Sequence, residues 1–218
     1  MSIELPPGAA AYSDRNPPPQ NRQALVFLGL FIGTIILIVW VAGWIASSLV
    51  WWIPPQVEQK LGQAIVPTYE ALAQPSATQE SLNGLLDRLE SHLSDDLHAG
   101  RDYQVLYIPE DTVNAIAIPG DRIIIYQGLL DEMESENELM MVLGHELGHF
   151  ANRDHLRGLS RQLTVRLLLA TFLGDAGSIG AIASSGASMV ASAQFSQQQE
   201  YQADEIGLRL LDQEYGQV

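Results

Sequence analysis

The residues best suited to chemistry lie together in the segment His145-Glu146-Leu147-Gly148-His149, an HExxH motif. On a helix, residues four positions apart share a face, so the two imidazoles can ligate one metal ion. Glu146 lies beside them and can reach a water on that ion. Zn²⁺ is the expected metal, because it accepts imidazole nitrogen and carboxylate oxygen and keeps one position open in catalytic sites. The motif therefore predicts a centre that activates water.

Two histidines leave a third protein ligand to be found, and two residues are candidates. Glu200 is expected in the first turn of another helix, with Asp204 one turn later and able to accept a hydrogen bond from a ligand imidazole. His155 occupies the last position of the HExxHxxxxxH pattern of metzincins, although that pattern needs glycine where this chain has Asn152. Asn tolerates the left-handed conformation, so the second option stays open. We favour Glu200, which would leave His155 at the surface or behind a ligand.

Two capped helices would present these side chains. The sequence Ser135-Glu136-Asn137-Glu138 is typical of a capping box and predicts a helix that runs to about Asn152. Ser196-Gln197-Gln198-Gln199 is a second capping sequence and predicts a helix through about Leu211. The HExxH motif would lie on the first helix, and Glu200 would lie at the start of the second.

A small sheet is expected before these helices. Apolar runs bounded by turn residues predict strands at 103–108, 112–118 and 122–126, the last two as a hairpin. Further upstream, helices are expected at 57–72, with Pro67 inside, and over the leucine-rich segment 82–97, whose period of 3.6 residues indicates a core-facing stripe. The predicted fold class is α+β, mostly helical, with a zincin-like domain, a small antiparallel sheet and an active-site helix.

A long apolar segment lies near the N-terminus. The run 24–53 contains all four tryptophans and no charged residue, and it exceeds the roughly 20 apolar residues that span a bilayer. Two of the tryptophans lie at its end, where an interfacial aromatic belt forms. We therefore expect one transmembrane helix at 24–53, with a cleaved signal peptide as the alternative. The proline-rich segment 1–23 is expected to be disordered.

The charges that flank this segment predict its orientation. Arg15 and Arg22 precede it and Lys60 follows closely, so the positive-inside rule places the N-terminus in the cytoplasm and the remainder outside it. A later stretch, 167–193, is rich in Ala, Gly and Ser but contains Asp175. We expect closely packed helices there, and a second membrane span is the alternative.

Composition excludes several classes of function. The chain has 11 Lys and Arg against 26 Asp and Glu, a formal net charge of −15. Nucleic acid is therefore not expected as a partner, because binding it needs a basic face. The chain has no cysteine, which excludes disulfides and thiolate metal sites. A bound metal must therefore be held by His, Asp or Glu.

Four sequence blocks resemble the gluzincin metallopeptidases of the HtpX, CAAX prenyl protease and BepA type, peptidase family M48. The blocks are NAIAIPG (114–120), IIIYQGLL (123–130), HELGHFANRDH (145–155) and EYQADEIG (200–207). The resemblance implies an endopeptidase with one Zn²⁺ per chain, held by His145, His149 and Glu200. It also implies that Glu146 is the general base and that Asp204 supports a ligand imidazole.

The same resemblance implies a substrate-binding strand. In such enzymes the strand that corresponds to Asn114, Ala115, Ile116 and Ala117 lines the cleft and pairs with an extended substrate, as an edge strand can. Family members continue beyond the third ligand with further helices and a side chain that stabilises the oxyanion. This chain ends at Val218. We therefore expect a peptidase domain that is C-terminally incomplete or minimal.

The expected organisation is a disordered tail (1–23), a transmembrane helix (24–53), a helical juxtamembrane region (54–100) and a zinc metallopeptidase domain (101–218). The expected function is that of a membrane-anchored metalloendopeptidase acting on misfolded, membrane or envelope proteins. Its expected partners are the protein substrate and the lipid bilayer. One alternative is a metzincin that uses His155, and another is a non-catalytic, membrane-tethered zinc-binding or interaction module.

Overall fold

The computed structural model describes residues 21–98, 100–173, 189 and 194–216. The chain divides into two compact units, Met1–Val41 and Ala42–Val218. Helix α1 (Asn21–Leu49) begins in the first unit, and the 3₁₀ turn η1 (Val50–Trp52) follows it in the second.

One stretch of the described residues, Asn21–Trp52, is long and apolar enough to cross a membrane. It matches the expected span 24–53 closely. Its first three residues fall within the segment predicted to be disordered, and residues 1–20 of that segment lie outside the described residues. The helix therefore begins slightly earlier than the charge pattern alone indicates.

A three-stranded sheet lies at the centre of the second unit. Its strands are β1 (Gln104–Ile108), β2 (Ala115–Ile118) and β3 (Arg122–Tyr126), in the spatial order β1-β3-β2. The expectation of an antiparallel sheet holds for the β2–β3 hairpin, whereas β1 pairs with β3 in parallel. The path of the chain explains this difference. After β1 the chain crosses to the far edge, returns as β2 and then fills the centre with β3.

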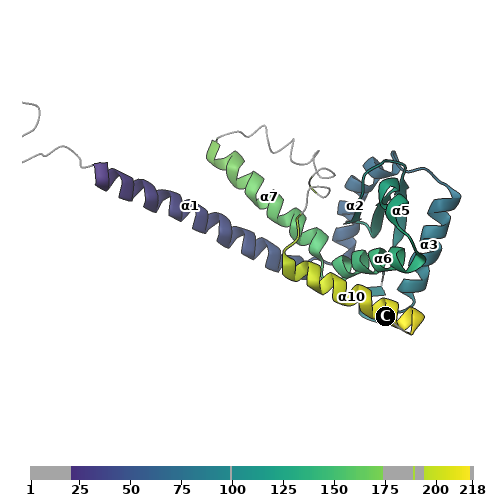
Figure 1. The fold of residues 1–218 in the computed structure, drawn as a ribbon. Helices are drawn as coiled ribbons and strands as arrows, with labels where there is room; N and C mark the ends of the chain where they lie inside the picture. The colour runs from purple at the N-terminus through teal and green to yellow at the C-terminus, as the bar shows by residue number, and fades with distance from the viewer. Residues whose placement is uncertain (1–20, 99, 174–188, 190–193, 217–218) are drawn as a thin grey trace, which may run out of the picture. The chain divides into compact units, whose positions relative to one another are not determined.

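Helices cover both faces of the sheet, as α2 and α3 show in Figure 1. On one face the strands pack against α3 (Ala77–Glu90) and α6 (Glu136–Ala151), and on the other against α2 (Pro55–Glu70) and α7 (Asp154–Leu173). The central strand β3 is therefore buried on both sides, and Ile123, Ile124 and Ile125 are fully buried. This explains why β3 is continuously apolar rather than alternating.

The outer edge of β1 is closed by polar groups from outside the sheet. Asn83 Oδ1 accepts a hydrogen bond from the N–H of Val105 at 2.8 Å, and Gln79 Oε1 accepts one from the N–H of Tyr107 at 3.1 Å. The carbonyl of Tyr107 accepts a third from the N–H of Gln74 at 3.2 Å. Edge strands are templates for pairing with other strands. On this side these three main-chain groups of β1 are already occupied.

The helices upstream of the sheet differ in detail from the prediction. The leucine-rich helix ends at Glu90, and a short helix, α4 (Asp95–His98), follows it. Leu82, Leu86 and Leu89 are buried in the core, as their spacing predicts. Helices α2 and α3 pack on the same sheet as the rest of the second unit. Helix α5 (Gln127–Glu132) follows β3 directly and is not expected from the sequence, because the apolar run of β3 continues into it.

The two site-bearing helices begin as their capping sequences predict. Ser135 Oγ accepts from the N–H of Glu138 at the start of α6, although the Glu138 carboxylate bonds the N–H of Glu134 instead of completing the box. Ser196 and Gln199 form a complete capping box at the start of α10 (Gln197–Tyr215). Helix α7 covers the first part of the small-residue stretch, while residues 174–188 and 190–193 lie outside the described residues.

A buried polar cluster ties α2 and α7 to the turns around the sheet. Arg101 binds the carboxylate of Glu58 through two nitrogens, at 3.0 and 2.9 Å, and binds Asp121 at 2.6 Å. His155 Nε2 lies 2.7 Å from Glu58 Oε1. Glu58 and His155 are each 1% exposed, so they depend on one another to satisfy their charge and hydrogen bonds.

We expect acid to destabilise the fold by protonating Glu58. Burial raises the pKa of Glu58, but hydrogen bonds from His155 and Arg101 outweigh it and lower the pKa from 4.5 to about 2. A carboxyl whose pKa is lower in the folded state stabilises the fold above its ordinary pKa and loses that contribution as the pH falls toward 2. Thermal unfolding in detergent micelles should show a loss of at most about 3 kcal/mol over this interval.

Glu58→Gln should unfold at a lower temperature than the wild type at neutral pH and should lose most of this acid dependence. The matched control is Glu132→Gln, because Glu132 is exposed on α5. Wild-type stability and an unchanged pH profile in Glu58→Gln would contradict the role of the cluster.

Candidate metal centre

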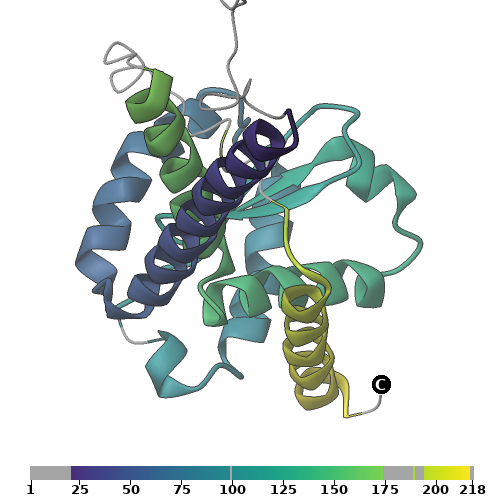
Figure 2. The ribbon, with the colours of Figure 1, turned by 90° about the vertical axis from the view of Figure 1, so that its left-hand side faces the viewer.

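Helices α6 and α10 approach so closely that their backbones are in contact. A Cβ added to Gly148 would lie 2.7 Å from the Cα of Ala203, and one added to Gly144 would lie 3.0 Å from the Cα of Gly207. Only glycine fits such positions without displacing the neighbouring helix. Figure 2 shows α10 crossing α6. This contact places the first turn of α10, with Glu200, opposite the HExxH motif.

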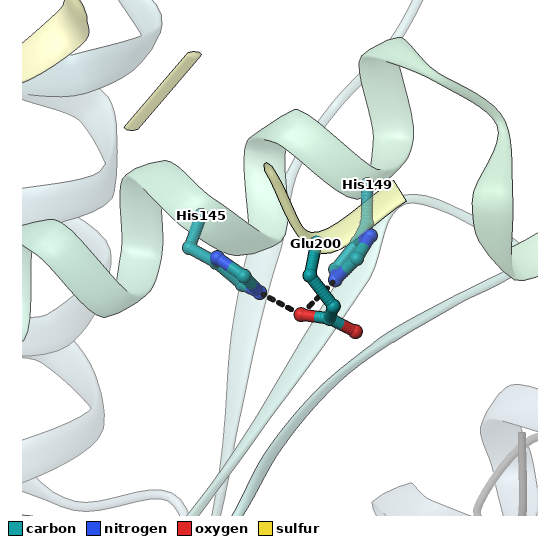
Figure 3. Close-up of side chains that lie close together, drawn as sticks. All are labelled: His145, His149 and Glu200. Carbon is teal, nitrogen blue, oxygen red and sulfur yellow. Dashed lines mark ion pairs between the residues drawn. The ribbon is translucent and has the colours of Figure 1, made fainter. Parts of the chain in front are cut away.

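The three predicted metal ligands converge. Figure 3 shows His145 and His149 projecting from one face of α6 toward Glu200, whose Oε2 lies 3.4 Å from Nε2 of His145 and 3.9 Å from Nε2 of His149. One ligand atom of each residue lies within 4.8 Å of the other two. Within the described part of the chain, this is the one group of His and acidic residues with such geometry.

Each imidazole is oriented by a carboxylate on its other nitrogen. His145 Nδ1 lies 2.8 Å from Asp204 Oδ1, which is the contact predicted for Asp204. His149 Nδ1 lies 3.1 Å from Asp154 Oδ2. When Nδ1 carries the proton and donates it to a carboxylate, the lone pair of Nε2 is available to a metal. Both Nε2 atoms face Glu200, so the two rings are already oriented for coordination.

Asp154 is a functional residue that the sequence reasoning missed. Its side chain is fully buried, and its Oδ1 also accepts a hydrogen bond from Gln199 Nε2 at 2.5 Å. Burial lowers the pKa of the His149 imidazole, but the hydrogen bond to Asp154 and the charges of Glu146, Asp154 and Glu200 together outweigh it, and the pKa is raised. The available signal was an acidic residue in the first turn of the helix that follows the motif.

Phe195 is a second residue that the sequence reasoning missed. Its ring lies against the imidazole of His149, with 4.2 Å between the ring centroids and 31° between the planes. It directly precedes the cap of α10, where the capping sequence drew attention to the polar residues instead. Asp154, Phe195 and the edge of His145 together surround the ring of His149.

His155, the alternative third ligand, is not part of the metal-binding group. Its Nε2 bonds Glu58, and its ring packs against Phe150 with 4.7 Å between centroids. The expectation that it lies at the surface is wrong, since it is 1% exposed. The metzincin turn would need a left-handed residue at Asn152, which has a φ of −85°. The left-handed residue is instead Arg153, at +54°, and α7 begins directly after it.

Glu146 lies beneath the free edge of β2. Tyr126 N–H donates to Asn114 O at 3.3 Å, and bonded pairs alternate along an antiparallel ladder, so Ala115 and Ala117 direct their main-chain groups away from β3. Burial raises the pKa of Glu146, while the two histidines and a backbone hydrogen bond from Ala117 lower it by less. A buried carboxylate with a raised pKa is suited to accept and release a proton near neutral pH.

A cleft of about 350 Å³ lies at this edge and reaches His145 and Glu146. Its walls come from β2 and the segment before it, from α5, and from α6 and α10; the lining residues are Val113, Asn114, Ala115, Leu129, Met141, Val142, His145, Glu146 and Asp204. Of the predicted substrate-binding residues, Asn114 and Ala115 line the cleft, Ile116 is half-buried and Ala117 is buried. Their binding role stays a prediction.

All residues of this metal centre lie within a range of the chain that matches the model of a known protein family. The model of peptidase family M48 matches residues 77–218. The chain belongs to peptidase family M48. The resemblance drawn from the four sequence blocks is thereby confirmed.

Several characterised proteins are similar to this M48 chain. Mitochondrial metalloendopeptidase OMA1 of Arabidopsis thaliana is 31% identical over 115 residues, metalloprotease LoiP of Escherichia coli is 36% identical over 117, and the beta-barrel assembly-enhancing protease of Escherichia coli is 30% identical over 142. The alignments cover 51%, 51% and 60% of this chain, and 23%, 45% and 28% of the relatives. The chain therefore spans less than half the length of each.

The donors of this site fit the zinc ion on which M48 metalloproteases depend. Two imidazole nitrogens and one carboxylate oxygen form a three-ligand set that leaves a fourth tetrahedral position open, which is typical of catalytic zinc. The two Nδ1 atoms are occupied by carboxylates, as zinc-binding histidines require.

Gly148→Ala should weaken metal binding. The added methyl group would collide with the backbone of Ala203, so α10 and Glu200 must move away from the two histidines. We expect a loss of about 1–3 kcal/mol in stability together with weaker zinc binding. Thermal unfolding and competition with a chromophoric chelator measure the two effects.

Gly84→Ala is the matched control, since no atom lies within 4 Å of a Cβ added there on α3. It should leave zinc affinity unchanged and stabilise the helix by about 0.5–1 kcal/mol. If Gly148→Ala binds zinc as tightly as Gly84→Ala, the backbone contact does not set the ligand geometry.

Asp154→Asn should lower zinc affinity by about 10–100-fold. The asparagine side chain can accept hydrogen bonds only through its oxygen and not through its nitrogen. Either His149 or Gln199 therefore loses its acceptor. Asp212→Asn, an exposed position on α10, serves as the control and should bind zinc like the wild type. Equal affinities in the two variants would show that Asp154 does not orient His149.

Proposed function

We propose that this chain is a membrane-anchored zinc endopeptidase that hydrolyses peptide bonds of misfolded, membrane or envelope proteins. The observation that carries the proposal is the convergence of His145, His149 and Glu200 beside the buried carboxylate of Glu146. Membership of family M48 supports a metalloprotease, and the similar proteins are named as metalloproteases or proteases.

In this proposal the three ligands hold Zn²⁺ through two Nε2 atoms and the Glu200 carboxylate. Asp204 and Asp154 bind the Nδ1 atoms, so the rings stay oriented with Nε2 directed at the metal position. Zinc bound there would lower the pKa of a water toward about 7 and polarise a carbonyl group.

Glu146 is proposed to move the proton during hydrolysis. Its carboxylate takes a proton from the attacking water while the water oxygen bonds to the scissile carbonyl carbon, and it delivers that proton to the amide nitrogen as the carbon–nitrogen bond breaks. Burial, which raises the pKa of Glu146, favours holding the proton between these two events. The N–H of Ala117 holds the carboxylate in position.

The substrate would bind as an added strand. The outward main-chain groups of Ala115, together with the carbonyl of Ala117, offer an extended peptide a ladder along β2. A side chain of the peptide would enter the cleft, where Val113, Leu129 and Val142 are apolar. A peptide must be extended to bind in this way, which favours unfolded segments over folded ones.

The apolar helix Asn21–Trp52 is proposed to anchor the chain in a membrane. We place the N-terminus in the cytoplasm and the peptidase unit outside it, because Arg15 and Arg22 precede the helix and Lys60 follows it.

Glu146→Gln tests the function directly. The variant should keep its zinc, because Glu146 is not one of the three ligands, and should lose at least about 10²-fold in kcat, because the amide cannot accept the proton. The measurement is cleavage of a denatured protein by the full chain in detergent micelles, with metal content determined on the same sample. Cleavage that persists in Glu146→Gln would exclude this mechanism.

Glu200→Ala tests whether Glu200 is the third metal ligand. It should lose zinc, whereas Glu205→Ala, an exposed position on the same helix, should retain it. If the wild-type chain binds zinc and cleaves no protein, the chain is instead a non-catalytic zinc-binding module.

A further inference from the structure

Three consecutive side chains at the junction of α6 and α7 reach three different parts of the second unit. Arg153 contacts the turn that follows the apolar helix, which we call the exit turn (Val50–Ile53). Asp154 contacts the ligand His149, and His155 contacts Glu58 on α2. The exit turn and the metal centre are therefore contacted by two residues that are adjacent in the sequence, Arg153 and Asp154.

Arg153 combines an unusual backbone conformation with a contact to the exit turn. Its φ of +54° lies in the left-handed region, where an arginine is unfavourable. Its Nη1 donates to the carbonyls of Val50 at 2.9 Å and Ile53 at 2.5 Å. Carbonyls at the C-terminal end of a helix attract a cation, and the Val50 carbonyl also accepts a hydrogen bond from the N–H of Ile53 at 3.1 Å. Val50 is 1% exposed, so this residue of the turn is packed in place as well as hydrogen-bonded.

The next residue, Asp154, connects the backbone at Arg153 to the ligand His149. Asp154 is fully buried, and its two oxygens bond His149 on α6 and Gln199 in the first turn of α10. That turn also carries Glu200. A change in the backbone at Arg153 would move the Asp154 carboxylate and, with it, the relation between the second and third ligands.

We propose that Arg153 is a positioning residue that couples the exit turn to the metal centre. The exit turn contributes no ligand, yet its carbonyls fix Arg153, Arg153 fixes the backbone of Asp154, and Asp154 fixes His149. Metal affinity and turnover would then depend on correct packing of the segment that leaves the apolar helix. The inference rests on the proposed function only for its effect on turnover, because the effect on zinc affinity is independent of proteolysis.

The test compares two substitutions of Arg153 in the full chain in detergent micelles. Arg153→Gly keeps the left-handed backbone accessible and removes the guanidinium. Arg153→Lys keeps a cationic donor that can reach the carbonyls. The readouts are zinc affinity by chelator competition, thermal unfolding of the metal-free protein, and kcat and KM for a denatured protein substrate.

Arg153→Gly should bind zinc roughly tenfold more weakly and lose kcat by a similar factor, with KM within about twofold of the wild type. Arg153→Lys should restore both values to within about threefold. Arg161→Ala, an exposed arginine on α7, is the matched control and should behave like the wild type.

Wild-type zinc affinity in Arg153→Gly overturns the coupling, and so does an equal loss in Arg161→Ala. If Arg153→Gly does not fold, Arg153→Asn replaces it, because asparagine also tolerates the left-handed region. If no variant and no wild-type chain cleaves protein, the proposed function fails, while the zinc affinities still decide whether Arg153 positions the ligands.

Discussion

The short distance between α6 and α10 is the constraint on which the metal-binding group depends. Two ligands lie on one helix and the third on the other, so no loop can adjust their separation. Gly144 and Gly148 face Ala203 and Gly207 across the contact, and only hydrogen atoms fit between the backbones. The sheet, its covering helices and the capping box of α10 all serve to hold these two helices at that separation.

Buried carboxylates then determine how the side chains point. Asp154 and Glu146 lie within the site, and Glu58 lies behind it, and each is shielded from water. A buried charge is unfavourable unless donors surround it. Here the donors are imidazole rings, a guanidinium and main-chain N–H groups, so each carboxylate fixes the orientation of the group that neutralises it. The polar interior is therefore arranged around the histidines.

Local patterns predicted the elements of the site, and long-range contacts supplied the rest. The HExxH spacing, the capping residues Ser135 and Ser196, and the leucine stripe depend on neighbours in sequence, and they correspond to helices in the structure. The parallel pairing of β1 depends on how the chain crosses the sheet, which no local pattern records. The roles of Asp154, Phe195 and Arg153 arise where separate segments meet, so their sequence context gave little indication of them.

The two edge strands of the sheet differ in whether their outward main-chain groups are hydrogen-bonded. Amide side chains from α3 and the N–H of Gln74 occupy β1, whereas Ala115 and Ala117 of β2 direct main-chain groups away from the sheet. An unprotected sheet recruits further strands at both ends and can grow into fibres. With one end sealed, growth stops after a single addition. Strand pairing between copies of this chain would therefore be confined to the β2 edge and could not extend through β1 into a fibre.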